Sequence, residues 1–129
     1  MTLTSRLVVD SWAWIEYFGG STSGRVVDRM MSDAEIWTSV ISITEIVSKY
    51  HRKGIDESKA METIFAISRT DSPDREDARE AGRMHAEVKA KSPNFGLADS
   101  FVLQLARKFG GKVVTGDPDF RGVKEAQLI

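Results

Sequence analysis

Short apolar segments that end at an acid or a hydroxyl residue alternate with helical patterns along this chain. This alternation constrains the fold more than any other feature. Runs of apolar and β-branched residues occupy positions 7–9, 36–38 and 113–114. Their composition and their polar flanks predict buried strands. Strands that alternate with helices indicate an α/β domain built on a parallel sheet.

The segments between these strands have the apolar spacing of helices. We expect helices at residues 11–18, 22–31, 39–53, 56–67, 72–90 and 97–109, and further short strands at 67–70 and 123–129. The chain has 129 residues and shows no repeat, linker or low-complexity segment. A single domain over residues 1–129 is therefore expected.

The composition excludes several kinds of site. The chain has no cysteine, which rules out disulfides, thiolate nucleophiles and zinc–thiolate centres, and its two histidines are too few for a histidine-rich metal site. No apolar stretch approaches the ~20 residues of a membrane span, so we expect a cytoplasmic protein that does not enter membranes. The formal net charge of −1 predicts no overall affinity for polyanions, although bound divalent cations would make the charge positive.

Four acids lie where solubility does not require them. Asp10 and Asp117 follow the first and last of the three apolar runs, and ligands of open α/β sheets bind outside the carboxyl ends of strands. Glu45 interrupts the most apolar part of its helix, and Asp99 lies one turn into another helix. If the first and fourth strands are neighbours, Asp10 and Asp117 face the same crevice.

Each acid also has a purely structural interpretation. Asp10 can be the N-cap of the following helix, and Glu45 can be a solvated helix residue. Asp99 can be an acid favoured by the helix dipole, and Asp117 can be a turn residue before Pro118. Taken one at a time, these residues do not decide between a structural role and a site.

The four acids occur in the stretches LVVDSWAWIEYF, TSVISITEI, LADSFVLQLA and VVTGDPDF. In their order and spacing, these stretches resemble the PIN domain, and in particular the VapC-like toxins of bacteria and archaea. The resemblance implies a three-layer α/β/α sandwich with a short central parallel sheet of four to five strands. It also implies a metal-dependent endoribonuclease, the toxin of a toxin–antitoxin pair, which inhibits translation by cleaving RNA. The positions matched to catalytic, metal-holding acids are Asp10, Glu45, Asp99 and Asp117, with Asp119 as an accessory acid and Thr115 as a supporting hydroxyl residue.

The chemistry of such a cluster requires a cation or protons. Two carboxylates ~4 Å apart repel by roughly 4 kcal/mol at an effective dielectric near 20. Oxygen ligands suit Mg²⁺ or Mn²⁺, which would activate water for hydrolysis of the phosphodiester. We expect Asp10 and Asp99 to bind the metal directly and Glu45 to bind through water or to orient the nucleophile. Asp117 would help to hold this ion or a second one.

RNA binding also requires basic or aromatic contacts. The candidates for phosphate contacts are Lys49, Arg52 and Lys53, which lie on the helix that carries Glu45. Arg25, on the preceding helix, is a weaker candidate. These basic residues equally suit the C-terminus of a helix. Trp12 and Trp14 have a possible role in stacking on bases, but their apolar helix favours packing in the core or in a dimer.

The resemblance further implies protein partners. VapC-like proteins usually bind a small antitoxin, which places a helix in a groove and a basic side chain in the acidic site. They usually form homodimers, which can pair again through the antitoxin. In this chain, we expect the groove between two helices. One carries Val26, Val27 and Met30, and the other carries Ile64 and Phe65.

Two rival functions remain from the sequence. The chain could be a PIN-like module that binds RNA or a protein without cleavage, and a cleavage assay would decide. A phosphatase of the haloacid dehalogenase type needs a second acid two residues after its nucleophilic aspartate. Trp12 occupies that position after Asp10, which argues against a phosphatase.

Overall fold

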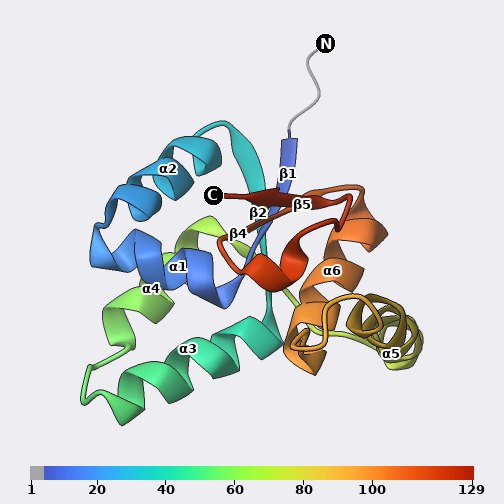
Figure 1. Ribbon diagram of the computed structural model, residues 1–129. Helices are drawn as coiled ribbons and strands as arrows, with labels where there is room; N and C mark the ends of the chain where they lie inside the picture. The colour runs from blue at the N-terminus through green and yellow to red at the C-terminus, as the bar shows by residue number, and fades with distance from the viewer. Residues whose placement is uncertain (1–4) are drawn as a thin grey trace.

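Strands and helices alternate along the chain as the sequence predicts (Figure 1). The computed structural model describes residues 5–129, so the first four residues of the predicted domain lie outside the described residues. The elements are β1 (Ser5–Val9), α1 (Ser11–Gly19), α2 (Thr22–Met31), β2 (Ala34–Ser39), α3 (Val40–Arg52), α4 (Ser58–Ile67), β3 (Arg69–Asp71), α5 (Arg75–Lys89), α6 (Leu97–Phe109), β4 (Lys112–Thr115), the 3₁₀ helix η1 (Pro118–Phe120) and β5 (Ala126–Leu128). None of the helices described is long and apolar enough to cross a membrane.

The five strands form one parallel sheet in the order β3-β2-β1-β4-β5. Strand β1 lies between β2 and β4, and its Val9 is in register with Val114 of β4. The chain moves to one side of β1 first and to the other side later, so the strand order reverses between β1 and β4. In open α/β sheets this is the position of a ligand crevice. The first and fourth strands are therefore neighbours, which is the condition under which Asp10 and Asp117 face one crevice.

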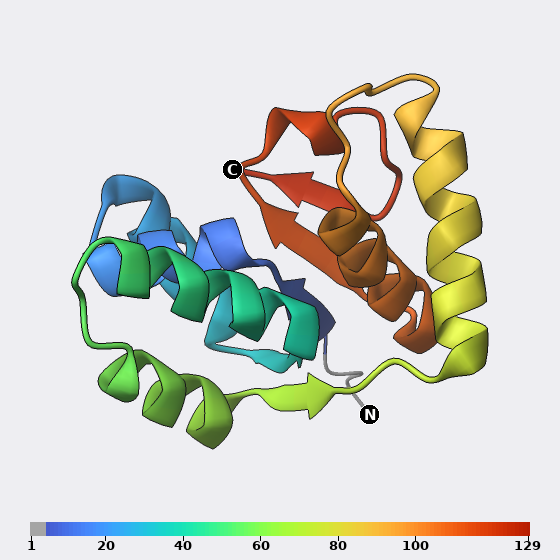
Figure 2. The same cartoon turned by 90° about the horizontal axis from the view of Figure 1, so that it is seen from below.

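Helices cover both faces of the sheet, with α1 to α4 on one side and α5 and α6 on the other (Figure 2). Neighbouring residues of β1 alternate between the two cores, because Val9 packs with Trp14 and Ile46 whereas Val8 packs with Leu103 and other residues of the opposite core. These side chains are almost fully buried, and each large one contributes about 1.5–3 kcal/mol to the hydrophobic free energy of folding. The predicted three-layer α/β/α sandwich is confirmed.

Some element boundaries differ from the prediction for local reasons. Strand β3 covers Arg69–Asp71 instead of 67–70, because Ile67 is still the last residue of α4. Helix α5 begins at Arg75 instead of 72, because Asp74 is its N-cap and closes a capping box. The last strand is confined to Ala126–Leu128. These shifts leave the topology unchanged.

Candidate active site

Two of the predicted acids leave the sheet at neighbouring strand ends. Asp10 follows β1, and its Oδ1 accepts a hydrogen bond of 2.8 Å from the Ala13 N–H, which caps α1. Asp117 lies two residues after β4, and its Oδ1 accepts a hydrogen bond of 2.9 Å from the Asp119 N–H, which caps η1. Because β1 and β4 pair, the two caps lie side by side at the point where the strand order reverses.

The other two acids reach this edge from helices on opposite faces. Glu45 lies on α3, and its Oε1 accepts a hydrogen bond of 3.1 Å from the hydroxyl of Ser11, the residue after Asp10. Asp99 lies in the first turn of α6, and its Oδ2 accepts a hydrogen bond of 2.9 Å from the Gly96 N–H. We call Asp10, Glu45, Asp99 and Asp117 the acidic cluster.

The structural interpretations of three of these acids agree with the structure. Asp10, Asp99 and Asp117 each accept a hydrogen bond from a backbone N–H at the start of a helix. Each of these bonds uses one carboxylate oxygen, whereas a carboxylate has two. Capping and cation binding are thus compatible roles for the same side chain.

Asp10 has the most perturbed carboxyl of the cluster. Burial raises its pKa to about 7, although hydrogen bonding to Thr115 and to the Ala13 N–H offsets part of the effect. The negative charges of Asp99 and Asp117 raise the pKa further. A carboxyl with such a pKa exchanges its proton near neutral pH, which is typical of functional sites.

The remaining acids respond to the same surroundings. Burial raises the pKa of Asp99 to about 6, the Gly96 N–H offsets part of this, and nearby carboxylates add to the rise. The pKa of Glu45 is also raised, first by burial and then by the charge of Asp117. The charged groups that shift these values are all carboxylates, so the acids of the cluster act on one another.

The donor set fits a hard divalent cation by its chemistry. Carboxylate oxygens without thiols or imidazoles are the ligands that Mg²⁺ and Mn²⁺ prefer. Within residues 5–129, however, no three acidic or histidine side chains are close enough to hold one ion together. The acids therefore lie near one another without converging on a point. Repulsion between carboxylates favours this separation, and a cation would offset it.

Thr115 and Asp119 lie where supporting residues are expected. The Thr115 side chain is fully buried, and its Oγ1 accepts a hydrogen bond of 3.0 Å from the Asp117 N–H. This bond fixes the start of the loop that carries Asp117. The pKa of Asp119 is raised by burial and by the charge of Asp117, which places Asp119 at the border of the cluster.

The sequence analysis missed two features of the site. Ser11 connects Glu45 to the Asp10 segment, although a serine after an acid gives no strong local signal. The second feature is the contact between Trp12 and Gly116, which lies between Thr115 and Asp117. A Cβ atom on Gly116 would lie only 2.2 Å from Cη2 of the Trp12 indole. The glycine in "VVTGDPDF" is the signal that could have indicated this close approach.

Gly116→Ala is expected to lower the free energy of unfolding by about 1–3 kcal/mol, because the methyl group forces the Trp12 indole or the β4 loop to move. Thermal unfolding measures the loss, and Trp12→Ala combined with Gly116→Ala should cost less than the sum of the single changes. Gly82→Ala is the control, because a Cβ on Gly82 meets nothing within 4 Å and lies in a helix, where alanine is favoured. Additive losses at Trp12 and Gly116 would contradict the contact.

The predicted basic residues lie in two places. Lys49, Arg52 and Lys53 are neighbours at the end of α3, where Lys49 and Lys53 line a groove of about 440 Å³ and Arg52 is exposed. Arg25 lines a separate pocket with Asp28. A role of these residues in RNA binding stays a prediction.

A groove is also present in the helical layer that carries the predicted partner residues. It lies between α1, the end of α3 and the first half of α4, so α4 contributes to it as predicted, whereas α2 does not. Val27 and Ile64 themselves are buried in the core. The lining of the groove consists of Ile15, Phe18, Gly19, Lys49, Tyr50, Lys53, Ile55, Asp56, Lys59, Ala60 and Thr63. We call it the apolar groove.

Comparison with known families agrees with this architecture. The PIN domain family model matches residues 7–126, and the chain therefore belongs to the PIN domain family. No curated protein matches the chain in sequence. The family resemblance seen in the four acidic stretches is thus confirmed.

Solved structures share the fold at low sequence identity. A toxin–antitoxin complex from Klebsiella pneumoniae aligns with a TM-score of 0.75 and 15% identity, covering 95% of this chain and 96% of that chain. VapBC2 from Rickettsia felis, bound to a DNA fragment from its promoter, gives a TM-score of 0.71 and 14% identity, covering 96% and 97%. VapC20 of Mycobacterium tuberculosis, described as a sarcin–ricin loop cleaving toxin, gives 0.71 and 15% identity, covering 92% and 95%.

Proposed function

We propose that this protein is a divalent-cation-dependent endoribonuclease and the toxin of a toxin–antitoxin pair. The observation that carries the proposal is the acidic cluster at the reversal of strand order in a PIN domain. Burial and mutual repulsion hold the carboxyls of Asp10 and Asp99 partly protonated near neutral pH, which makes the cluster a natural site for a cation. The similarity to toxin structures supports the biological role.

In the proposed mechanism, Asp10 and Asp99 would hold Mg²⁺ or Mn²⁺, and Asp117 would complete the site. When bound, the cation would supply Lewis-acid chemistry, which neutralises phosphate charge and makes water a better nucleophile. Glu45, with its raised pKa and its hydrogen bond from Ser11, is suited to orient the attacking water and to accept its proton. Thr115 keeps the loop of Asp117 in place.

The apolar groove supports the proposal of an antitoxin partner. Its lining combines the apolar side chains of Ile15, Phe18 and Tyr50 with three lysines, Lys49, Lys53 and Lys59. An amphipathic helix with acidic flanks would complement this surface. A homodimer, and a larger assembly with the antitoxin, belong to the same proposal, and light scattering of the protein with and without its partner tests both.

The cleavage test compares the wild type with Asp10→Asn on single-stranded RNA, with Mg²⁺ or Mn²⁺ and with a chelator. We expect the wild type to cleave only with the cation and Asp10→Asn to lose at least about a hundredfold in rate. The introduced asparagine still accepts the bond from the Ala13 N–H, so the helix cap remains. Asp33→Asn, an exposed aspartate outside the cluster, is the matched control.

The two failures of this test have different meanings. Cleavage by Asp10→Asn at the wild-type rate would show that the active-site assignment is wrong. Binding of RNA by the wild type without any cleavage would favour the alternative, a PIN-like binding module. Mapping of cleavage ends in total RNA, after induction of the wild type and of Asp10→Asn, would then identify the target.

A further inference from the structure

A pocket of about 400 Å³ with basic walls lies apart from the acidic cluster and from the basic residues predicted from the sequence. It forms where the end of α5 meets the segment between η1 and β5. Its lining residues are Glu87, Val88, Lys91, Ser92, Arg107, Arg121, Gly122, Val123 and Lys124. We call it the basic pocket.

The four cations of the basic pocket outnumber the two nearby acids, Glu87 and Glu125. Arg107 is held by Glu125, with 3.2 Å between Nε and Oε2. Lys91, Arg121 and Lys124 are exposed, and none of them takes part in an ion pair within the described part of the chain. Glu87 is the one acid among the lining residues. This excess of positive charge occurs in a chain of formal net charge −1, so an anionic ligand is favoured locally.

Two segments connect the basic pocket with the acidic cluster. The first runs from Asp117 through η1 to Arg121, which directly follows Phe120. The second runs from Lys91 along residues 92–96 to Gly96, whose N–H binds Asp99.

The two connecting segments are held together between their ends. The fully buried rings of Phe95 and Phe120 meet edge to face, with 5.2 Å between their centroids. The loop before α6 accordingly runs beside η1 (Figure 2). The basic pocket and two members of the acidic cluster, Asp99 and Asp117, thus lie at opposite ends of the same two segments.

We propose that the basic pocket binds backbone phosphates of the single-stranded RNA whose scissile bond lies at the acidic cluster. This inference rests on the proposed ribonuclease function. Lysine and arginine side chains attract phosphates without regard to base sequence, and a basic groove that follows the backbone is typical of single-strand binding. The strand would cross η1 and leave its phosphates between Lys91 and Lys124, while the acidic cluster holds the bond to be cleaved.

The test uses full-length protein with Asp10→Asn, so that binding is measured without cleavage. A triple variant, Lys91→Glu with Arg121→Glu and Lys124→Glu, is compared with a triple variant of equal charge change, Arg29→Glu with Arg75→Glu and Lys112→Glu. These three control residues are exposed and lie outside the basic pocket, the apolar groove and the basic residues predicted from the sequence. Anisotropy of a labelled 10-nucleotide RNA is measured at several salt concentrations. We expect the first triple variant to bind at least tenfold more weakly, with a salt slope lower by about 2 for three lost phosphate contacts. The control should stay within about threefold of the parent.

Three outcomes would overturn the inference. Equal losses in the two triple variants would show that only overall charge matters. Unchanged RNA affinity in the first variant would exclude the pocket from the RNA path. A labelled polyglutamate peptide serves as a probe for an acidic protein partner. If the first triple variant loses binding to this peptide and keeps its RNA affinity, the basic pocket is a protein interface. Circular dichroism of both variants checks that they are folded.

The failure of this inference is distinguishable from failure of the proposed function. Cleavage is measured separately, with Asp10 restored in both triple variants. If the wild type does not cleave RNA but the first triple variant loses RNA binding, the proposed RNA-binding role of the basic pocket is supported and the nuclease proposal is wrong. If the wild type cleaves and the first triple variant keeps the wild-type kcat/KM and affinity, only the proposed role of the basic pocket is wrong.

Discussion

At pH 8 and without divalent cations, Asp10→Asn is expected to unfold on the order of 10 °C above the wild type. The Asp10 carboxyl is buried, and its pKa rises from the ordinary value of 3.8 to about 7. A difference of about three pKa units corresponds to a cost of about 4 kcal/mol for holding the charged form in the folded protein. Asparagine removes this charge and keeps the cap on the Ala13 N–H.

The sign of this effect fixes its pH dependence. Between about pH 4 and pH 7, the folded protein binds a proton at Asp10 that the unfolded chain has lost. The free energy of unfolding of the wild type should therefore fall as the pH rises through this range. The asparagine of the variant does not titrate, so the two melting temperatures should converge near pH 4 and separate toward pH 8. Differential scanning calorimetry across this range measures the separation.

Divalent cations provide the complementary measurement. A cation that binds the folded protein raises its melting temperature, and at the acidic cluster it must compete with protons. We expect Mn²⁺ to stabilise the wild type more at pH 8 than at pH 5.5, and to stabilise Asp10→Asn less at either pH. The exposed Asp33→Asn is the control for both series. A lower melting temperature of Asp10→Asn at pH 8 would show that the Asp10 charge is not a cost to folding.

The sequence predicted the sheet and the four acids because both leave local signals. A run of β-branched residues marks a strand regardless of its neighbours, and an acid directly after such a run marks its carboxyl end. The proximity of Asp10 and Asp117 stayed conditional, because adjacent strand ends of a parallel sheet meet at one edge but the sequence does not show which strands are adjacent. Local signals also gave the interpretation of Asp10 as a helix cap and of Asp99 as an acid at a helix start, and both agree with the structure.

What the sequence missed depends on contacts between distant segments. Lys91 and Lys124 belong to different loops and line one pocket, and these loops are joined by the packing of Phe95 on Phe120. The lining of the apolar groove was not predicted, because the apolar spacing of a helix identifies a buried face but not what covers it. In the same way, no local signal distinguishes Asp77 from the other acids of α5, although Asp77 is buried and makes long-range contacts.

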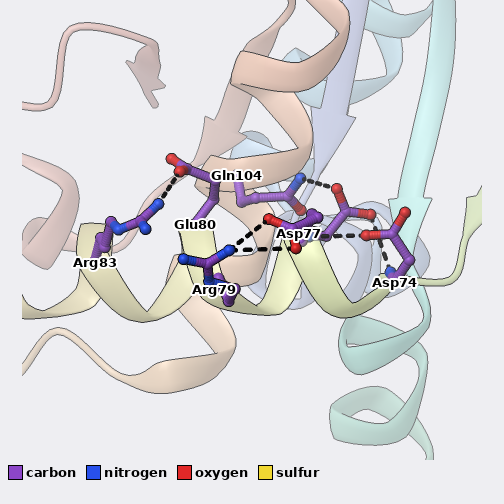
Figure 3. Close-up of polar contacts among 7 residues, drawn as sticks. Asp74, Asp77, Arg79, Glu80, Arg83 and Gln104 are labelled. Carbon is purple, nitrogen blue, oxygen red and sulfur yellow. Dashed lines mark hydrogen bonds and ion pairs between the residues drawn. The ribbon is translucent and has the colours of Figure 1, made fainter.

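Asp77 joins α5 to α6 through both of its carboxylate oxygens. Oδ1 accepts a hydrogen bond of 2.9 Å from Gln104 Nε2, and Oδ2 accepts one of 2.9 Å from Lys108 Nζ. Figure 3 shows Gln104 reaching from α6 to Asp77, next to the capping box that Asp77 forms with Asp74. Burial alone would raise the pKa of Asp77, but these hydrogen bonds outweigh it and hold the pKa below its ordinary value.

Asp77→Ala is expected to lower the free energy of unfolding by about 2–4 kcal/mol at pH 7. The change removes the capping box and leaves Gln104 Nε2 without its hydrogen-bond acceptor. Within the described residues, Oε1 of the same side chain already has no hydrogen-bond partner. Because the pKa of Asp77 is lowered in the folded state, its stabilisation is present above the unfolded pKa and is lost as the pH falls below about 4. Urea unfolding at pH 7 and pH 3 measures both effects.

The matched control lies one residue away. Glu76 forms an exposed ion pair with Arg79 on the same helix, with 3.1 Å between Oε2 and Nη1. Exposed pairs contribute little, so Glu76→Ala should cost no more than about 0.5 kcal/mol. Equal losses for Glu76→Ala and Asp77→Ala would show that only helix charge is involved. Asp77 and Asp10 should also give opposite pH slopes, because hydrogen bonds outweigh burial and lower the pKa of Asp77, whereas burial outweighs the hydrogen bonds and raises the pKa of Asp10. An Asp77→Ala loss that persists at pH 3 would show that packing, and not the ionised carboxylate, accounts for the stabilisation.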